Sequence, residues 1–215
     1  MQDKQAILYP EGTYHIYNRA NGSEQMFLSE DNYGYFLSKY NGYISRVSNT
    51  LCYCLMPNHF HFLVRIKGEK DIIDEILKKG GASAKTLQGF RTLEGFDRQK
   101  IISSFLSLQF SHLFNSYTQA FNKQIGRKGS LFMHPFKRKL IQDEKYLRKL
   151  IHYIHYNPIE AGLTKSLEGW KYSSYNAIVS RSETRLQREE VLGYFDNLEN
   201  FIYCHKSPPN VSGME

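Results

Sequence analysis

An α+β fold is predicted by the order of the hydrophobic patterns along the chain. Strand-like stretches at residues 12–19 and 51–66 enclose a helical pattern at residues 31–47. A second helical pattern at 103–122, a short strand at 136–141 and a third helical pattern at 144–156 follow. The order strand, helix, hairpin, helix, strand and helix predicts a ferredoxin-like antiparallel sheet with helices packed on one face. We expect a helical C-terminal extension after it.

The length of the chain indicates its domain organisation. Its 215 residues allow one domain of about 150 residues with an appendage, and a hydrophobic content of 41% is sufficient for a core. We therefore expect a main domain at residues 1–163 and an extension at residues 164–215. The extension has a helical stretch at about residues 188–203, and we expect its tail, from Ser207, to be disordered.

The charge balance of the chain is basic. A net charge of +7 and a pI of about 9.2 favour an acidic partner, with nucleic acid as the first candidate. A basic soluble protein without such a partner is the alternative. No apolar run approaches the ~20 residues of a membrane span, and the N-terminus lacks the pattern of a signal peptide. Cys52, Cys54 and Cys204 form no disulfide framework, so we expect a cytoplasmic protein without a membrane partner.

Two histidines lie on the second strand of the predicted hairpin. The first strand of this hairpin ends at Met56, and the dipeptide at 57–58 indicates the turn. Because successive side chains of a strand point to opposite faces, His59 and His61 share one face, with their Cα atoms about 6–7 Å apart. Phe60 and Phe62 point the other way, into a core. The two neutral imidazoles can bind a divalent metal, and two half-buried histidines packed in a sheet are the alternative.

The segment at residues 67–102 interrupts the regular order. We expect a short helix at 71–79 and then a glycine-rich loop that is functional or mobile. The amphipathic helix at 103–122 ends in a basic loop at 126–130. The next strand carries three consecutive cations, Lys137, Arg138 and Lys139. Such a run is typical of a solvated edge strand or of contacts to a phosphate backbone.

The helix at residues 144–156 has a polar flank beside its core stripe. We expect Asp143 to cap it and the pair Asn157-Pro158 to end it, because a residue before proline avoids the α conformation. Tyr153 and Asn157 are four residues apart and lie one above the other on this flank, whereas Tyr156 points toward solvent. An ordinary boundary tyrosine is the alternative to a reactive Tyr153.

Three ordered motifs resemble those of the single-tyrosine HUH transposases, and most closely the REP-associated tyrosine transposases. They are YHIYNR at residues 14–19, LMPNHFH at residues 55–61 and YIHYNPIEAG at residues 153–162. Shorter matches around Tyr117, Arg127 and Phe136 lie between them. The resemblance covers residues 12–175.

This resemblance implies a metal-dependent strand transferase for single-stranded DNA. His59 and His61 would bind Mg²⁺ or Mn²⁺, Tyr153 would be the nucleophile, and Asn157 would be a third metal ligand in a slot where related enzymes carry Gln. The attack would give a 5′-phosphotyrosine at or near a DNA hairpin. Candidate DNA contacts are Arg19, Arg127, Lys128, Lys137, Arg138 and Lys139. Related enzymes work as dimers or monomers, so a homodimer stays open, and a cytoplasmic protein would be nucleoid-associated when bound to DNA.

Two other functions are compatible with the same residues. The first is a non-catalytic nucleic-acid-binding module on the same fold. The second is a metal-dependent nuclease that uses His59 and His61 but activates water in place of Tyr153. A covalent protein–DNA adduct would distinguish the transposase from both.

Overall fold

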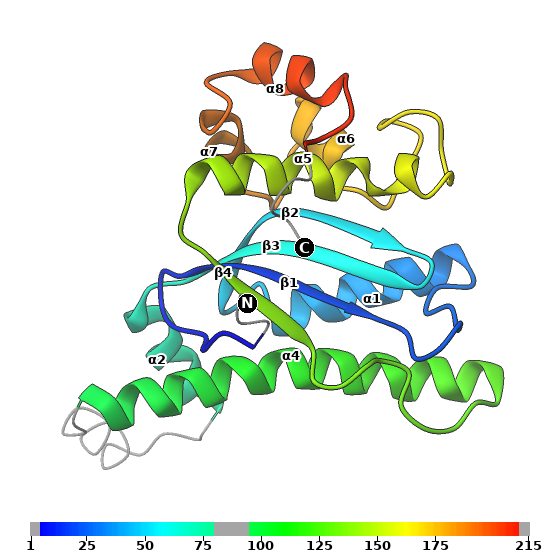
Figure 1. Ribbon diagram of the computed structural model, residues 1–215. Coiled ribbons are helices and arrows are strands. Elements are labelled where there is room, and N and C mark those ends of the chain that lie inside the picture. Colours follow the sequence, from blue (N-terminus) through cyan, green and yellow to red (C-terminus); the bar gives the residue numbers. More distant parts are fainter. Residues whose placement is uncertain (1–4, 80–94, 211–215) are drawn as a thin grey trace.

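The computed structural model describes residues 5–79 and 95–210, in which a four-stranded sheet lies between two layers of helices (Figure 1). The strands are β1 (Thr13–Arg19), β2 (Ser48–Met56), β3 (His59–Ile66) and β4 (Lys137–Ile141). The longer helices are α1 (Glu30–Tyr43), α2 (Glu69–Lys79), α4 (Gly95–Ile125) and α5 (Glu144–Glu160). The C-terminal helices are α6 (Tyr175–Val179), α7 (Arg188–Gly193) and α8 (Leu198–His205).

The sheet has the strand order β2-β3-β1-β4, and each neighbouring pair is antiparallel. β1 lies in the centre between β3 and β4, although β4 follows it by more than a hundred residues. Connections through α1 and through α2 and α4 bring the strands back into one sheet. The predicted α+β class is confirmed.

The two faces of the sheet have separate hydrophobic clusters. Phe60 and Phe62 point into the cluster of α1 and α4, where the Phe60 ring lies 5.4 Å from that of Phe36. Leu63, which points the other way, packs against Ile151 and Ile154 of α5. Figure 1 shows α5 and the C-terminal helices above the sheet and α4 below it. Helices therefore cover both faces, which corrects the expectation of helices on one face.

The C-terminal extension covers the outer edge of β2. Its backbone bonds this edge at three places: Leu55 N donates to Tyr172 O at 3.0 Å, Ser174 N donates to Tyr53 O at 2.9 Å, and Gln187 N donates to Thr50 O at 3.0 Å. The expected helical stretch is divided into α7 and α8, because Asp196 has a φ of +67°. A domain boundary at residue 163 stays a prediction, and residues 211–215 of the expected disordered tail lie outside the described part.

The helix α4 begins earlier than predicted. The segment at 67–102 contains the expected short helix, as α2, and also the first turns of α4, where a loop was expected; residues 80–94 lie outside the described part of the chain. Ile102 is buried one turn before Leu106, so the apolar stripe extends toward the N-terminus of the helix. The sequence did not indicate this extension, because Gly95 was interpreted as part of a flexible loop.

The helix α5 passes through Pro158 and ends at Glu160, so the predicted stop at the pair Asn157-Pro158 is wrong. Gly162, with a φ of +69°, follows the end of the helix. Its N–H donates to Ile159 O, and the next N–H donates to Pro158 O, both at 2.9 Å. This pair of bonds is a Schellman motif, for which glycine has the required backbone freedom. Pro158 has no N–H to donate to Ile154 O, and the helix continues past it for only two residues.

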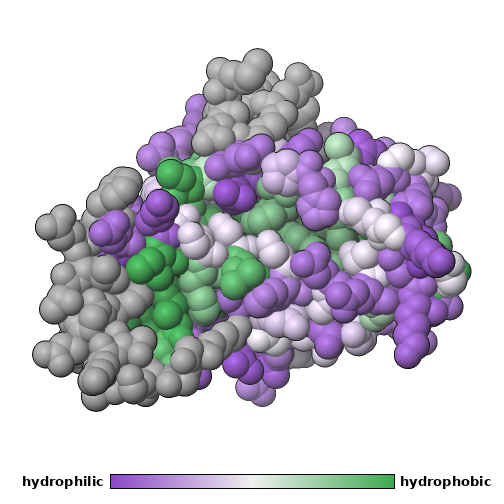
Figure 2. Space-filling view, turned by 90° about the horizontal axis from the view of Figure 1, so that it is seen from below, coloured by the Kyte–Doolittle hydropathy of each residue, from purple (hydrophilic) through white to green (hydrophobic). Residues whose placement is uncertain are grey.

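The face seen from below α4 is mostly hydrophilic, with apolar side chains gathered toward the left of the space-filling view (Figure 2). Ile101 and Leu108 are among the exposed apolar side chains of α4. Among the described residues, no helix is long and apolar enough to span a lipid bilayer.

Candidate active site

A pocket of about 270 Å³ opens between the sheet and α5, near the C-terminal end of β1 and the start of β3. It is lined by Tyr17, Asn18, Arg19, Asn58, His59, His61, Lys137 and Tyr153. Five of the residues predicted from the sequence therefore meet in or at one pocket: His59, His61, Tyr153, Arg19 and Lys137.

Strand pairing places the two histidines beside β1. His61 is opposite Tyr17 and His59 is opposite Arg19, so all four side chains share one face of the sheet. The His59 and His61 rings are 5.1 Å apart between centroids and nearly perpendicular, at 87°. His61 is buried, and His59 lies at the rim of the sheet, where it follows the turn. The sequence predicted this shared face, and the structure confirms it.

Each histidine has a partner on its Nδ1 atom. His59 Nδ1 lies 2.7 Å from Asn58 Oδ1, and since a carbonyl oxygen only accepts, the ring donates from Nδ1 and keeps a lone pair on Nε2. His61 Nδ1 lies 2.9 Å from His15 Nε2. His61 Nε2 is buried and has no hydrogen-bond partner among the described residues. Histidines that bind metals commonly have the second ring nitrogen held in this way.

The donors present fit a divalent metal only if a group other than His, Cys, Asp or Glu completes the site. In residues 5–79 and 95–210, no group of three or more of those four residue types lies close enough to bind a metal ion. Asn157 offers an amide oxygen beside His59: burial lowers the pKa of His59, and a hydrogen bond to the Asn157 side chain partly offsets that lowering. Two imidazoles and one oxygen suit Mn²⁺ at least as well as Mg²⁺, which prefers oxygen ligands alone.

The helix α5 brings Tyr153 to the histidines. The Tyr153 ring lies 5.7 Å from the His61 ring between centroids, in an edge-to-face arrangement. Asn157, one turn later, donates from Nδ2 to Tyr153 O at 2.8 Å. The core stripe of the helix holds this flank in place, since Leu150 and Ile154 are fully buried. The predicted neighbours Tyr153 and Asn157 thus lie on the same flank.

Burial determines the protonation states in the pocket. It lowers the pKa of His59 and, together with the charges of His15 and His59, it lowers the pKa of His61 well below the usual value. Both rings are therefore neutral near pH 7, as a metal ligand must be. Burial raises the pKa of the Tyr153 phenol, while a hydrogen bond to Asn157 lowers it in part. A phenol of this kind needs a nearby positive charge to become a nucleophile.

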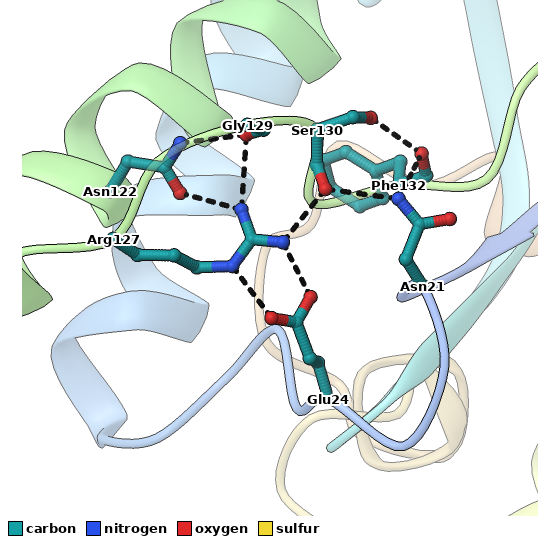
Figure 3. A network of polar contacts seen from close by, with 7 residues as sticks. All are labelled: Asn21, Glu24, Asn122, Arg127, Gly129, Ser130 and Phe132. Carbon is teal, nitrogen blue, oxygen red and sulfur yellow. Dashed lines mark hydrogen bonds and ion pairs between the residues drawn. The ribbon is translucent and has the colours of Figure 1, made fainter.

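Arg127, predicted from the sequence as a phosphate contact, is engaged within the protein (Figure 3). Its guanidinium binds both carboxylate oxygens of Glu24, at 2.8 and 2.5 Å. It also donates to Asn122 Oδ1 at 3.0 Å and to the carbonyl oxygens of Gly129 and Ser130, at 3.0 and 2.7 Å. These bonds join the loop after α4 to the loop after β1, and Arg127 does not line the pocket.

The cations of β4 divide between the two faces of the sheet. Lys137 points to the pocket, and its Nζ lies 5.8 Å from the centre of the Tyr17 ring. Lys139 is on the same face but donates to Tyr146 Oη at 2.6 Å. Arg138 is on the opposite face and donates from Nε to Ala6 O at 2.7 Å. Lys128 is exposed in the loop after α4, outside the pocket.

Three pocket residues received no role from the sequence, namely Tyr17, Asn18 and Asn58, and neither did His15, which contacts His61 next to the pocket. His15 and Tyr17 stack at 4.5 Å, and Tyr17 lies 5.9 Å from His61. The signal for His15 and Tyr17 was the alternation in β1, where residues 13, 15, 17 and 19 share a face and all four are polar or aromatic with a polar tip. Asn58 was interpreted as a turn residue only.

Comparisons with known proteins bear on this site. No protein-family model matches the chain. A candidate REP-associated tyrosine transposase of Haemophilus influenzae is 26% identical over 129 residues, which are 59% of this chain and 58% of that protein. A solved structure of a REP-associated tyrosine transposase bound to a REP hairpin has a TM-score of 0.54 to this chain at 15% identity, and the match covers 84% of this chain and 87% of the other.

The resemblance is to REP-associated tyrosine transposases. The sequence motifs predicted it, and the two comparisons confirm it. The similarity of fold extends over most of this chain and of the solved REP-associated tyrosine transposase. The sequence alignment spans little more than half of the curated relative, at 58% of its length.

Proposed function

We propose that the chain is a metal-dependent transposase that cleaves and rejoins single-stranded DNA at hairpin-containing sites. The observation that carries this proposal is the convergence of His59, His61 and Tyr153 on one pocket, with the Nε2 atom of His61 buried and unpaired among the described residues. The solved relative that shares this fold is bound to a REP hairpin, which supports hairpin DNA as the substrate class. Such a protein would act on nucleoid DNA in the cytoplasm.

The residues of the pocket would divide the reaction between them. His59 and His61, with Asn157 as the third ligand, would hold a divalent ion. When bound, that ion would offset the negative charge of the scissile phosphate and orient it. Lys137 and Arg19 would contact neighbouring phosphates, because they line the same pocket and carry positive charge.

The proposed chemical step exchanges one phosphodiester for another. The Tyr153 oxygen loses its proton and forms a bond to phosphorus, while the bond between phosphorus and the 3′-oxygen breaks. The 3′-oxygen takes up a proton and leaves as a hydroxyl, and the 5′-end stays on Tyr153 as a phosphotyrosine. The reverse attack by a 3′-hydroxyl rejoins the strand without any external energy source.

A labelled single-stranded hairpin incubated with Mn²⁺ tests this function on denaturing gels, with mass spectrometry of the adducted peptide. We expect an adduct on Tyr153 and its loss in Tyr153→Phe, which removes one oxygen. Tyr156→Phe is the matched control, because it lies on the same helix outside the pocket, and its cleavage should stay within a few-fold. Full cleavage by Tyr153→Phe would favour a nuclease that activates water. Binding without any adduct would favour a non-catalytic module.

The sheet edges limit how a homodimer could form. The β2 edge is bonded by the C-terminal extension, and Ala6 N donates to Arg138 O at 3.1 Å on the outer side of β4. Edge-to-edge pairing of two copies would have to displace these bonds. We therefore propose that the chain acts as a monomer or pairs through a different surface.

A further inference from the structure

The outer side of α5 carries a row of cations that the proposed reaction does not use. Lys145, Arg148 and Lys149 are followed by His152, at intervals of three and four residues that place all four side chains on one stripe. This stripe lies opposite the apolar side chains that pack against the sheet. The four residues line a pocket of about 460 Å³ between α5 and the C-terminal segment that contains α8.

This pocket is positively charged. Lys145 and Lys149 have no ion-pair partner in the described part of the chain. Arg148 is only 3.9 Å from Glu144 in an exposed i, i+4 pair and 3.5 Å from Tyr194 O, so its charge is little compensated. Asp196 is the one acidic residue among the described lining residues. The surplus of positive charge favours an anionic ligand.

An exposed aromatic ring adjoins these cations. Tyr203 of α8 lines the pocket, and 73% of its surface is exposed, which is high for an aromatic side chain. Cations that follow a phosphate backbone beside an aromatic ring on which a base stacks are the common elements of single-strand binding sites. His152 adds a polar group, because its Nε2 has no hydrogen-bond partner among the described residues.

The helix connects this pocket to the proposed nucleophile. Lys145, Lys149, Tyr153 and Asn157 are each four residues apart, so they form one row along α5. Each step along this row is about 6 Å, since the rise is about 1.5 Å per residue. That step is similar to the spacing between neighbouring phosphates of an extended strand. A strand whose phosphate lies at Tyr153 can therefore continue over Lys149 to Lys145.

We propose that the pocket formed by Lys145, Arg148, Lys149, His152 and Tyr203 binds the single-stranded DNA that adjoins the scissile phosphate. The cations hold successive phosphates, and one base stacks on Tyr203. This inference rests on the proposed function for the identity of the strand, but the binding itself requires no cleavage.

Fluorescence anisotropy with two hairpins, one with a ten-nucleotide single-stranded tail and one without it, tests the inference over a range of salt concentrations. The variant Lys145→Gln/Arg148→Gln/Lys149→Gln is called the stripe variant. Its affinity for the tailed hairpin should fall at least tenfold, and its affinity for the untailed hairpin should stay within twofold. The slope of log K against log salt should become less negative by about 2, for three phosphates at about 0.7 each. Tyr203→Leu should weaken only tailed binding, by about fivefold or more.

The matched control is Lys70→Gln/Lys100→Gln/Lys123→Gln, which removes the same charge from exposed positions on α2 and α4, across the sheet. Its affinities should stay within twofold of the parent protein. The Tyr203 variant keeps the test decisive if the triple variant unfolds, because this side chain is largely exposed. Equal losses in the control and the stripe variant would overturn the proposal, as would a parent protein without preference for the tail. Competition by polyglutamate as strong as that by oligothymidylate would also overturn it, by assigning the pocket to polyanions in general.

Failure of this inference and failure of the proposed function give different results. If the chain is a non-catalytic module, no adduct forms on Tyr153, yet the tail preference and its loss in the stripe variant persist. If the transposase function holds but this pocket is not used, adducts form on Tyr153 and the stripe variant binds both hairpins like the parent.

Discussion

His15 Nε2 lies 2.9 Å from His61 Nδ1, and both rings are buried between β1 and the proposed metal site. Burial, with the charge of Lys139, lowers the pKa of His15 to about 3, so this ring is neutral and its Nε2 can accept a hydrogen bond. Donation from His61 Nδ1 then leaves a lone pair on His61 Nε2, the atom that has no partner in the described part of the chain. His15 would thus orient His61 as a metal ligand.

His15→Ala is expected to weaken Mn²⁺ binding by about 10- to 100-fold, the usual effect of removing a residue that orients a metal ligand. Isothermal titration calorimetry with Mn²⁺ measures this without any need for DNA cleavage. His15→Gln should restore part of the affinity, because its amide oxygen can still accept from His61 Nδ1. His112→Ala, at an exposed position of α4, is the control. Unchanged affinity in His15→Ala would contradict the orienting role.

Lys137 and Arg138 are adjacent in sequence but point to opposite faces of the sheet. Lys137 lines the candidate active site, whereas Arg138 donates to Ala6 O and lies 4.9 Å from the Phe136 ring. Lys137→Gln should make the salt slope of hairpin binding less negative by about 0.7, the value for one phosphate of a single strand. Arg138→Gln should leave that slope unchanged and lower the melting temperature instead. A salt slope that changes in Arg138→Gln and not in Lys137→Gln would show that the DNA phosphates contact the other face of the sheet.

Arg127 is expected to act on stability and not on DNA affinity. Arg127→Ala removes bonds to Glu24, to Asn122 of α4 and to two carbonyl oxygens of the loop after α4, so the melting temperature should fall by a few degrees. In a protein of this size each kcal/mol shifts the midpoint by about 2–4 °C. Arg127→Lys should restore little, because lysine lacks the planar fork that binds both oxygens of a carboxylate. Differential scanning calorimetry gives the midpoint. A changed slope of log K for DNA binding against log salt would show that Arg127 does contact DNA.

Local periodicity was sufficient to predict the sheet and the faces of its side chains. The alternation at residues 59–62 placed the histidines and phenylalanines on opposite faces, as the register of β3 with β1 confirms. The flank shared by Tyr153 and Asn157 followed from the helical period in the same way.

Other features depend on partners that are remote in sequence. His15 meets His61 across 46 residues, and Arg127 meets Glu24 across 103, so no window of the sequence contains either pair. The position of α5 on the second face of the sheet also depends on tertiary packing, because its apolar stripe does not specify which surface it covers. The helix end is a different case: Gly162 was visible in the sequence, but Pro158 was interpreted as the stop.

A chain of hydrogen bonds joins the C-terminal extension to α5. His205 Nδ1 lies 2.8 Å from Phe201 O, which only accepts, so His205 Nε2 must accept from His155 Nδ1 at 3.1 Å. His155 Nε2 then accepts from the Ser174 hydroxyl at 2.8 Å. With both histidines neutral, this is the set of proton positions that satisfies all three contacts, and it directs the Ser174 proton to His155 Nε2 at 2.8 Å and not to Tyr53 O at 3.1 Å.

Acid should therefore destabilise the protein through these histidines. Burial, with the charge of the nearby His152, lowers the pKa of His205 to about 3, and burial lowers the pKa of His155 well below its usual value. In the unfolded chain both pKa values return to about 6.5. Above that pH neither state binds a proton and stability does not change. Below it the unfolded state binds more protons, so the free energy of unfolding falls by about 1.4 kcal/mol per pH unit for each such histidine.

Urea unfolding between pH 7 and pH 4 measures this dependence, and the buried His15 and His61 add to the slope in the parent protein. His205→Gln should reduce the slope by about 1.4 kcal/mol per pH unit, the contribution of one proton, whatever it does to stability at pH 7. His112→Gln, at an exposed position of α4, is the control. An equal slope in His205→Gln and the parent protein would mean that His205 is protonated in the fold. The single set of proton positions from Ser174 to Phe201 would then be wrong, because a charged His205 would donate from both ring nitrogens.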